Sequence, residues 1–438
     1  MPFSKRQLIV FGIIGAVVLI AGLAFLFGGK SGEDTKTKKV KLVFWGVFDD
    51  TGDYRELMTE FASLYPGVTV EYRKKAIETY EKELAEAFAV GAGPDVFMVN
   101  NAWLPRYLNK IYYIDPAWEL MTVKEFQSAF ADVASKDLIY NNSIFGVPLY
   151  IDTLALFWNK DIFNSAGLAS PPKTWDEFKA DVKLLTKKDV FGNITRSGAA
   201  LGTASNVNRA SDILALLMLQ GGSPITDAAT GEPKFDRPIT IGNETYEPGK
   251  MALEFYTDFA NSKKEVYAWN NTLPYSLDAF TEGKTAMMFN YSYNIPIIQA
   301  QNPRLNFESA PMPQIDGTDS KVNYANYFAG AVSALSPNPK EAWQFILFLT
   351  EKEPQAYYLD ATGKPASRRD LLKIQMDDPI IGPFAEQALS AKSWYQFDNL
   401  ALEKAFADMI EWVAGGQETP ASAISRAKNK INILRQGG

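Results

Sequence analysis

The sequence predicts an α/β fold with more than one domain, and two observations indicate this. From Val40 onward, short apolar runs typical of strands alternate with amphipathic helical stretches. That alternation is the pattern of a parallel sheet with crossover helices. The chain also has 438 residues, which is too many for one compact core. Hydrophobic residues make up 47% of it and charged residues 22%, as is ordinary for globular proteins, so we expect buried cores.

Charge and residue usage exclude several classes of function. The formal net charge is -7, and no basic stripe points to nucleic acid. The chain contains no Cys and no His. It therefore has no disulfide, no thiol nucleophile, and neither the commonest general base nor the commonest metal ligand. We expect no cofactor and no metal.

The N-terminal residues predict a membrane anchor. Leu8–Phe27 are twenty uncharged, mostly apolar residues, the length of a membrane-spanning helix. Lys5 and Arg6 precede them, so residues 1–7 should stay in the cytoplasm. Residues 28–39 are polar and Lys-rich, as in a flexible stalk. The competing interpretation is a cleaved signal peptide, whose apolar region is normally shorter, roughly 7–15 residues. Either way, the remaining chain is exported.

The first elements after the stalk follow simple periodicities. The predicted strands are continuous apolar runs, as in buried strands, or alternate apolar with polar residues. The predicted helices have apolar residues at helical spacing. Asp53 with Glu56 three places later resembles a capping box. The predicted order is strand Val40–Trp45, helix Asp53–Tyr65, strand Val68–Tyr72, helix Tyr80–Val90 and strand Asp95–Val99.

Polar groups follow directly after the third of these strands. Asn100, Asn101 and Trp103 stand where the strand ends, and Pro105 suggests a new helix. Ligands of open α/β sheets bind beyond the carboxyl ends of the strands. Two amides and an indole offer the hydrogen bonds and the aromatic face that a neutral polyol needs. The alternative is a surface turn in which the Asn residues cap the helix and Trp103 packs at the rim.

The remaining elements are predicted in the same way. Pro148–Trp158 is a strand long enough to pass between lobes. Thr174 or Asp176 would cap the helix Trp175–Leu185. Gly221–Gly249 is rich in turn formers and should carry loops or a short hairpin. We further expect helices at Ser211–Leu219, Lys250–Phe259, Ala342–Leu349 and Arg426–Leu434, and a strand at Thr285–Phe289.

Five motifs now stand in a fixed order, and together they carry a family resemblance. They are GPDVFMVN from Gly93, GVPLYIDTLALFWNKDIF from Gly146, FTEGKTAMMFNYSY from Phe280, SPNPKEAWQFILFLTEKEPQAYYLDATGKPASRRD from Ser336, and GGQETPASAISRAKNKINILRQG from Gly415. This set resembles the family 1 extracellular solute-binding proteins of ABC importers, the group that includes maltose-binding protein. The resemblance implies no catalysis. It implies a monomer that captures a small-molecule solute, most often a carbohydrate, and delivers it to a membrane permease.

The resemblance also implies a two-lobe periplasmic-binding-protein-like fold of type II. The first α/β lobe would take residues 40–149 plus 321–359, and the second residues 152–312 plus 366–438. The chain would cross between them near residues 150–151, 311–313 and 361–365. The solute would lie in the cleft between the lobes, which would close over it by a hinge motion.

Several carboxylates and their neighbours become candidate ligand contacts through this resemblance. Asp49 lies in the loop after the first strand and would accept hydrogen bonds from hydroxyl groups; helix N-terminal charge is the alternative. Asp152 stands where a relative has a ligand-binding Glu, with Tyr150 beside it. An acid in so apolar a strand needs a partner, either the ligand or a basic residue such as Arg209. Core packing is the alternative for Tyr150.

Aromatic residues are the other candidates. Tyr293 stands at a stacking position of the family, with Tyr291 on the same strand face, and Trp103 would face it from the first lobe. Tyr327 and Trp394 follow in later loops, and core packing is the alternative for all of them. Maltose-binding protein carries an aromatic residue where Val99 stands and a carboxylate where Ala102 stands, so a maltose-like ligand is in doubt.

Three rival functions stay open at this stage. An exported glycoside hydrolase would use paired carboxylates, the only catalytic acids left in a chain without His. A sensory ligand-binding domain would need a cytoplasmic partner domain, and only about seven residues precede the apolar segment. Within the binding class, peptides, polyamines and anions are further ligands to consider. The favoured interpretation is a sugar-binding protein, tethered by one membrane span and facing the cell surface or periplasm.

Overall fold

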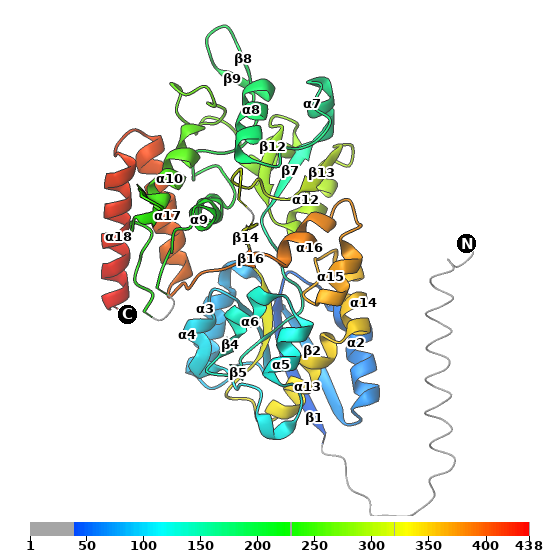
Figure 1. The fold of residues 1–438 in the computed structure, drawn as a ribbon. Coiled ribbons are helices and arrows are strands. Elements are labelled where there is room, and N and C mark those ends of the chain that lie inside the picture. The colour runs from blue at the N-terminus through cyan, green and yellow to red at the C-terminus, as the bar shows by residue number, and fades with distance from the viewer. Residues whose placement is uncertain (1–38, 228–229, 319, 438) are drawn as a thin grey trace, which may run out of the picture. The chain divides into compact units, whose positions relative to one another are not determined.

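Two separate sheets, each covered by helices, build the part of the chain that starts at Val40 (Figure 1). This computed structural model describes residues 39–227, 230–318 and 320–437. The predicted anchor Leu8–Phe27 and nearly all of the predicted stalk lie outside the described residues. Among the residues described, no helix combines the length and the apolar character that a membrane crossing requires.

The first sheet has five strands in the order β2–β1–β3–β15–β6. Its first three strands are parallel, as the alternation of strands and helices predicts, and β15 runs antiparallel to both β3 and β6. All five residues of β3 are buried, because helices cover both faces of the sheet. The strands are β1 (Val40–Val47), β2 (Val68–Lys75), β3 (Val96–Asn100), β6 (Val147–Pro148) and β15 (Phe328–Val332).

The helices of this first lobe come from two distant parts of the chain. Helix α2 packs against α13 and α14, which follow it by some 300 residues. The helices are α2 (Thr51–Leu64), α3 (Ile77–Ala89), α4 (Leu104–Tyr107), α5 (Val123–Ala129), α6 (Asp132–Leu138), α13 (Pro339–Leu349), α14 (Lys352–Thr362) and α15 (Arg369–Gln375). Short elements join them: η1 (Leu108–Lys110), η2 (Pro116–Trp118) and the hairpin β4 (Ile139–Tyr140)–β5 (Ser143–Ile144).

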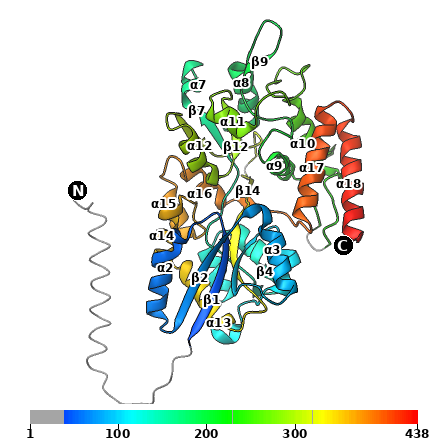
Figure 2. The same cartoon turned by 180° about the vertical axis from the view of Figure 1, so that it is seen from behind.

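The second sheet is small and antiparallel, with β7 (Ala155–Asn159) between β12 (Met287–Asn290) and β13 (Phe307–Ala310). Around it lie α7 (Lys160–Ser165), α8 (Trp175–Leu185), α9 (Ala210–Gln220), α10 (Pro248–Asp258), α11 (Ser276–Thr281), η3 (Ser292–Asn294), α12 (Ile295–Gln301) and α16 (Gly382–Ala388). The C-terminal helices α17 (Asn399–Ala414) and α18 (Pro420–Gly437) lie side by side at the edge of this lobe, as Figures 1 and 2 show from opposite sides.

Two hairpins project from the second lobe. One is β8 (Lys187–Lys188) with β9 (Ile194–Arg196), and the other is β10 (Ile239–Ile241) with β11 (Glu244–Tyr246). The second confirms the hairpin predicted within Gly221–Gly249. Thr174 is confirmed as the cap of α8, because its side chain accepts from the Glu177 N–H.

Some local predictions are wrong. The acidic pair at the start of α2 is Asp50 with Asp53, one turn earlier than predicted: the Asp53 carboxylate accepts from the Asp50 N–H at 2.7 Å. The long strand predicted over Pro148–Trp158 is interrupted, since β6 ends at Pro148 and β7 begins at Ala155. The residues between them cross from lobe to lobe and form isolated bridges with other segments instead of a sheet neighbour.

Three crossing segments meet between the lobes. Tyr150 bridges to Ala366, and Thr153 bridges to Ala325. Near them β14 (Asn323–Tyr324) pairs with β16 (Ala391–Lys392).

Two hydrophobic cores match the two lobes. One gathers residues from Val40 to Ile151 with residues from Ala325 onward, and the other gathers residues from Leu154 to Tyr324 with those of α17 and α18. The first core also takes in Leu371 and Leu372 of α15, which the expected boundaries assigned to the second lobe. The chain therefore leaves the first lobe later than the resemblance implied, after α15 and not near residues 361–365.

Candidate functional site

A cavity of about 860 Å³ lies between the two cores. The first lobe lines it with α3, with α4 and with the turn after β3. The second lobe contributes the start of α9 and the first turns of α17. Among the predicted site residues, five line this cavity: Asn100, Asn101, Trp103, Arg209 and Trp394.

The two asparagines at the end of β3 are held by the protein itself. The Asn100 side-chain amide donates to the Asn326 side-chain oxygen at 2.8 Å. The Asn101 amide donates to Asp137 at 3.0 Å, and its oxygen accepts from the Tyr327 N–H. Both side chains are thus oriented before any ligand arrives. Asn326, which also lines the cavity, was not among the predicted site residues.

Arg209 is the centre of a cluster on the second lobe. Its guanidinium donates two hydrogen bonds to the Tyr293 hydroxyl, at 2.9 and 3.1 Å. It also lies over the rings of Tyr291 and Tyr293, at 5.6 and 5.9 Å from their centroids. The Tyr291 hydroxyl donates to Asp212 at 2.8 Å, and Asp212 lines the cavity.

Asp212 is a site residue that the sequence interpretation missed. Burial raises the pKa of its carboxyl, while the Arg209 guanidinium and the Tyr291 hydroxyl act in the opposite direction. Its only sequence signal was its position three residues after Arg209, in the first turn of α9, where an acid is ordinary.

A row of aromatic rings runs from the first lobe to the second. Trp103 meets Phe328 edge to face at 5.5 Å, and Phe328 meets Phe48 in the same way at 5.6 Å. Phe48 is then stacked on Tyr293 of the second lobe, with centroids 6.0 Å apart and planes at 11°. Phe48 and Phe328 line the cavity, and neither was predicted.

Trp103 is less open than predicted. It is 6% exposed and belongs to the first core, with its ring 6.4 Å from that of Tyr107. A role as a stacking surface for ligand is therefore limited to the edge that reaches the cavity.

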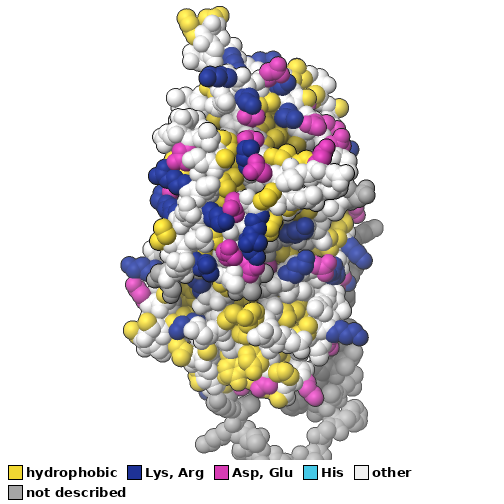
Figure 3. Space-filling view, turned by 60° about the vertical axis from the view of Figure 1, so that its left-hand side comes forward, with side chains coloured by type: hydrophobic (Ala, Val, Ile, Leu, Met, Phe, Trp, Pro, Cys, Tyr) yellow, Lys and Arg dark blue, Asp and Glu magenta, His cyan; other side chains and the backbone are white. Residues whose placement is uncertain are grey.

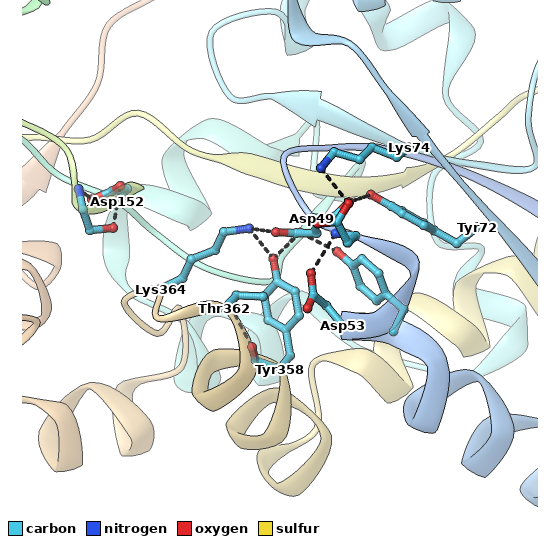
Figure 4. A network of polar contacts seen from close by, with 11 residues as sticks. Asp49, Asp53, Tyr72, Lys74, Asp152, Tyr358, Thr362 and Lys364 are labelled. Carbon is cyan, nitrogen blue, oxygen red and sulfur yellow. Dashed lines mark hydrogen bonds and ion pairs between the residues drawn. The ribbon is translucent and has the colours of Figure 1, made fainter. Parts of the chain in front are cut away.

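Asp49 was predicted to accept hydrogen bonds from a ligand, and the structure surrounds it with protein donors instead (Figure 4). Its carboxylate accepts from the hydroxyls of Tyr54 and Tyr358, at 2.9 and 2.7 Å, and forms a buried ion pair with Lys364. Its carbonyl accepts from the Tyr72 hydroxyl at 2.9 Å. Asp49 does not line the cavity.

Neither Asp152 nor Tyr150 lines the cavity, although both were predicted ligand contacts. Asp152 accepts from the Ser292 hydroxyl at 2.8 Å and from the Thr153 N–H at 2.9 Å, so it does not pair with Arg209. Burial raises the pKa of its carboxyl to about 6, although the hydrogen bonds from Ser292 oppose that rise. Lys364 lies over the ring of Tyr150, 4.5 Å from its centroid.

The last predicted residues divide between core and cavity. Tyr327 is buried and donates its hydroxyl to Asp137 at 2.8 Å. Trp394 lines the cavity, is stacked on Phe406 and donates its indole N–H to the Tyr324 hydroxyl at 3.1 Å. Tyr291 and Tyr293 do not line the cavity themselves but support Arg209, which does.

Comparison of the sequence with known protein families identifies the family to which this chain belongs. The family described as bacterial extracellular solute-binding protein matches residues 48–356. The chain belongs to this family.

Individual relatives and structures agree with that membership. A multiple sugar-binding protein of Streptococcus mutans is 25% identical over 363 residues, covering 81% of this chain and 82% of the relative. A putative binding protein of Brucella abortus is 23% identical and covers 79% of each chain. Among solved structures, the sugar-binding protein MalE of Xanthomonas citri superposes with a TM-score of 0.74 at 19% identity, covering 91% of this chain and 98% of that one. A cyclo/maltodextrin-binding protein complexed with maltotetraose gives a TM-score of 0.72 at 23% identity, covering 93% and 99%. These structures show that the two-lobe α/β fold is shared.

Proposed function

We propose that this protein captures a sugar, and specifically an oligosaccharide, between its lobes and delivers it to the permease of an ABC importer. One observation carries the proposal: a member of the solute-binding family has an interlobe cavity that combines oriented amides with aromatic rings. Amides and hydroxyls exchange directional hydrogen bonds, and aromatic faces suit the C–H faces of a sugar ring.

The charges around the cavity favour a neutral solute. Acidic lining residues are Glu78, Glu81, Asp212, Asp398 and Glu403, and basic ones are Lys82, Arg106, Lys110 and Arg209. The signs nearly balance, and Arg106 with Glu81 forms an ion pair. The face that carries α3, α4 and α17 shows basic and acidic side chains interspersed across its middle (Figure 3). A surface without a field of one sign does not attract anions or polyamines over neutral molecules.

The size of the cavity supports a solute of several sugar units. Its volume of about 860 Å³ falls toward the upper part of the range usual for ligand sites, roughly 300–1,000 Å³. A second hollow of about 580 Å³ adjoins it and shares Arg209, Ser211, Leu400 and Glu403 with it. Two of the relatives are named as binding proteins for galactooligosaccharides and for multiple sugars, which agrees with such a ligand.

Capture would proceed by hinge closure. The solute would bind to one lobe, and the other would rotate over it about the three crossing segments. We propose lobes made of residues 40–149 plus 321–359 and 152–312 plus 366–438, with α15 moved to the first. Asn100, Asn101, Arg209 and Trp394 are the proposed ligand contacts, with Asp212 and Asn326 added from the structure. No catalytic step is proposed, because the relatives are binding proteins and hydrolysis by paired carboxylates has no support in them.

A thermal-shift screen of the full chain tests this function. The library should hold neutral mono- and oligosaccharides beside peptides, polyamines and inorganic anions. A ligand at a hundred times its Kd adds about 2.7 kcal/mol to the free energy of unfolding, which is readily seen. Trp394→Ala should weaken the response, and Phe191→Ala, an exposed ring on the β8–β9 hairpin, should leave it unchanged. A response to polyamines or anions with none to any sugar would contradict the proposal.

We further propose that Leu8–Phe27 stays on the mature protein as a single membrane span, with the binding unit outside the cytoplasm. Its length and the preceding Lys5 and Arg6 support this. Mass spectrometry of protein extracted from membranes should recover a peptide from upstream of Gly28. A mature N-terminus near Gly28 would show that the segment is cleaved as a signal peptide.

A further inference from the structure

Phe48 is the point at which the aromatic row passes from one lobe to the other. Its ring lies edge to face on Phe328 of the first lobe and is stacked on Tyr293 of the second. Phe48 is nevertheless 39% exposed and belongs to neither hydrophobic core. Burial in a hydrophobic core therefore does not explain where the Phe48 ring lies.

The backbone at Phe48 is strained. Its φ is +71°, in the region that residues with a side chain seldom adopt. The Asp49 N–H donates to the Val47 carbonyl at 2.9 Å, which closes a three-residue turn around Phe48. Turns of this kind with positive φ at the centre are rare and costly, and such strain persists only where the surroundings impose it.

The network around Asp49 imposes it. The residue that follows Phe48 is held by its carboxylate, through Tyr54, Tyr358 and Lys364, and by its carbonyl, through Tyr72 (Figure 4). These groups are buried, so exchanging them for water is costly. The turn cannot relax without breaking that network, and the Phe48 ring stays directed at the second lobe.

The partner ring is held just as firmly. The Tyr293 hydroxyl accepts both hydrogen bonds from Arg209, whose guanidinium also lies over the ring. Two rings fixed on opposite lobes meet almost parallel, and both belong to the protein itself. Their attraction therefore acts whether or not a solute takes part.

From this we propose that Phe48 is a positioning residue that draws the lobes together by stacking on Tyr293. The contact would raise the affinity for every solute by the same factor. Observed affinity scales with the fraction of molecules in the binding-competent closed form. The inference rests on the hinge closure of the proposed function, but not on the identity of the sugar. The attraction within an aromatic pair of this kind changes the ratio of closed to open molecules by roughly 2- to 13-fold.

The chain contains no Cys, so two introduced cysteines can be labelled without background. Glu60→Cys on α2 and Ala180→Cys on α8 place spin labels on exposed sites of the two lobes. The distance between the labels is measured on the full chain by pulsed electron paramagnetic resonance, with no sugar added. Test variants are Phe48→Ala, Tyr293→Ala and the pair combined. Phe191→Ala, which removes an 85% exposed ring far from the cavity, is the matched control.

We expect Phe48→Ala and Tyr293→Ala to shift the distance distribution toward the open form by similar factors. The combined variant should shift no further, because either change alone removes the contact. Circular dichroism melting confirms that each variant is folded, and Phe48→Leu supplies a second, apolar replacement without an aromatic face. An unchanged distribution in folded Phe48→Ala or Phe48→Leu overturns the inference. If no sugar stabilises the protein in the thermal-shift screen, the proposed ligand is wrong. That result does not affect the distance measurement, which is made without sugar.

Discussion

The buried ion pair between Lys364 and Asp49 should make the stability of the first lobe sensitive to the loss of either charge alone. Lys364 is 7% exposed, and its ammonium group contacts the Asp49 carboxylate, the Tyr358 hydroxyl at 2.8 Å and the Tyr150 ring. Burial lowers the pKa of this ammonium group, and the attraction of Asp49 opposes that change. Lys364→Met keeps much of the volume and removes the charge, which leaves a carboxylate buried without a cation.

Removing one partner of a buried ion pair costs about 3–5 kcal/mol. Because two tyrosine hydroxyls would still donate to Asp49, we expect a value toward the lower end of that range. Domains of this kind are stable by roughly 5–15 kcal/mol, so the loss is a large fraction of the total. Urea unfolding at pH 7, followed by tryptophan fluorescence, measures it.

Lys183→Met is the matched control, since Lys183 pairs with Glu265 on the surface with both side chains largely exposed. It should change the unfolding midpoint little. The combined variant Asp49→Asn with Lys364→Met should regain much of the loss, because no charge is then left unpaired. Equal small losses in Lys364→Met and Lys183→Met, or no recovery in the combined variant, would refute the argument.

Three further predictions concern stability. Trp103→Ala should lower the free energy of unfolding by about 3–5 kcal/mol in urea titrations, as for a core ring, whereas a small loss would mean that the indole is mainly a ligand surface. The pKa of Asp152 is raised from 3.8 to about 6, so its protonated form favours folding. Its contribution is therefore complete below about pH 4 and is lost as the pH rises through 6. Relative to Asp152→Asn, the wild type should lose at most about 3 kcal/mol between those pH values, and a constant difference from pH 4 to 7 would contradict this. The chain has no Cys and no His, and among the described residues no group of three or more acidic side chains is placed to hold a metal ion. Neither EDTA nor a reductant should therefore shift the melting temperature, and a fall with EDTA would reveal a structural metal.

Elements whose signals are local could be predicted from the sequence. The buried strand β3, the Thr174 cap and the hairpin near Gly242 each follow from a few adjacent residues. The cavity lining at Asn100 and Asn101 was predicted as well, because the carboxyl end of a parallel strand is a general place for ligands. The lobe arrangement came from the resemblance to a family, which local patterns cannot supply.

The roles of charged and aromatic side chains were decided only by the tertiary structure. Asp49 lies 315 residues from Lys364 in the chain, and an acid after a strand is equally suited to a ligand or to an ion pair. Phe48 has an apolar side chain like any core residue, and only the network around the next residue places its ring between the lobes. The strand predicted through residues 148–158 breaks for the same kind of reason, since its pairing partners are other crossing segments. Sequence alone specified backbone periodicity and burial, because these depend on neighbours along the chain, whereas partner choice depends on which distant groups folding brings within reach.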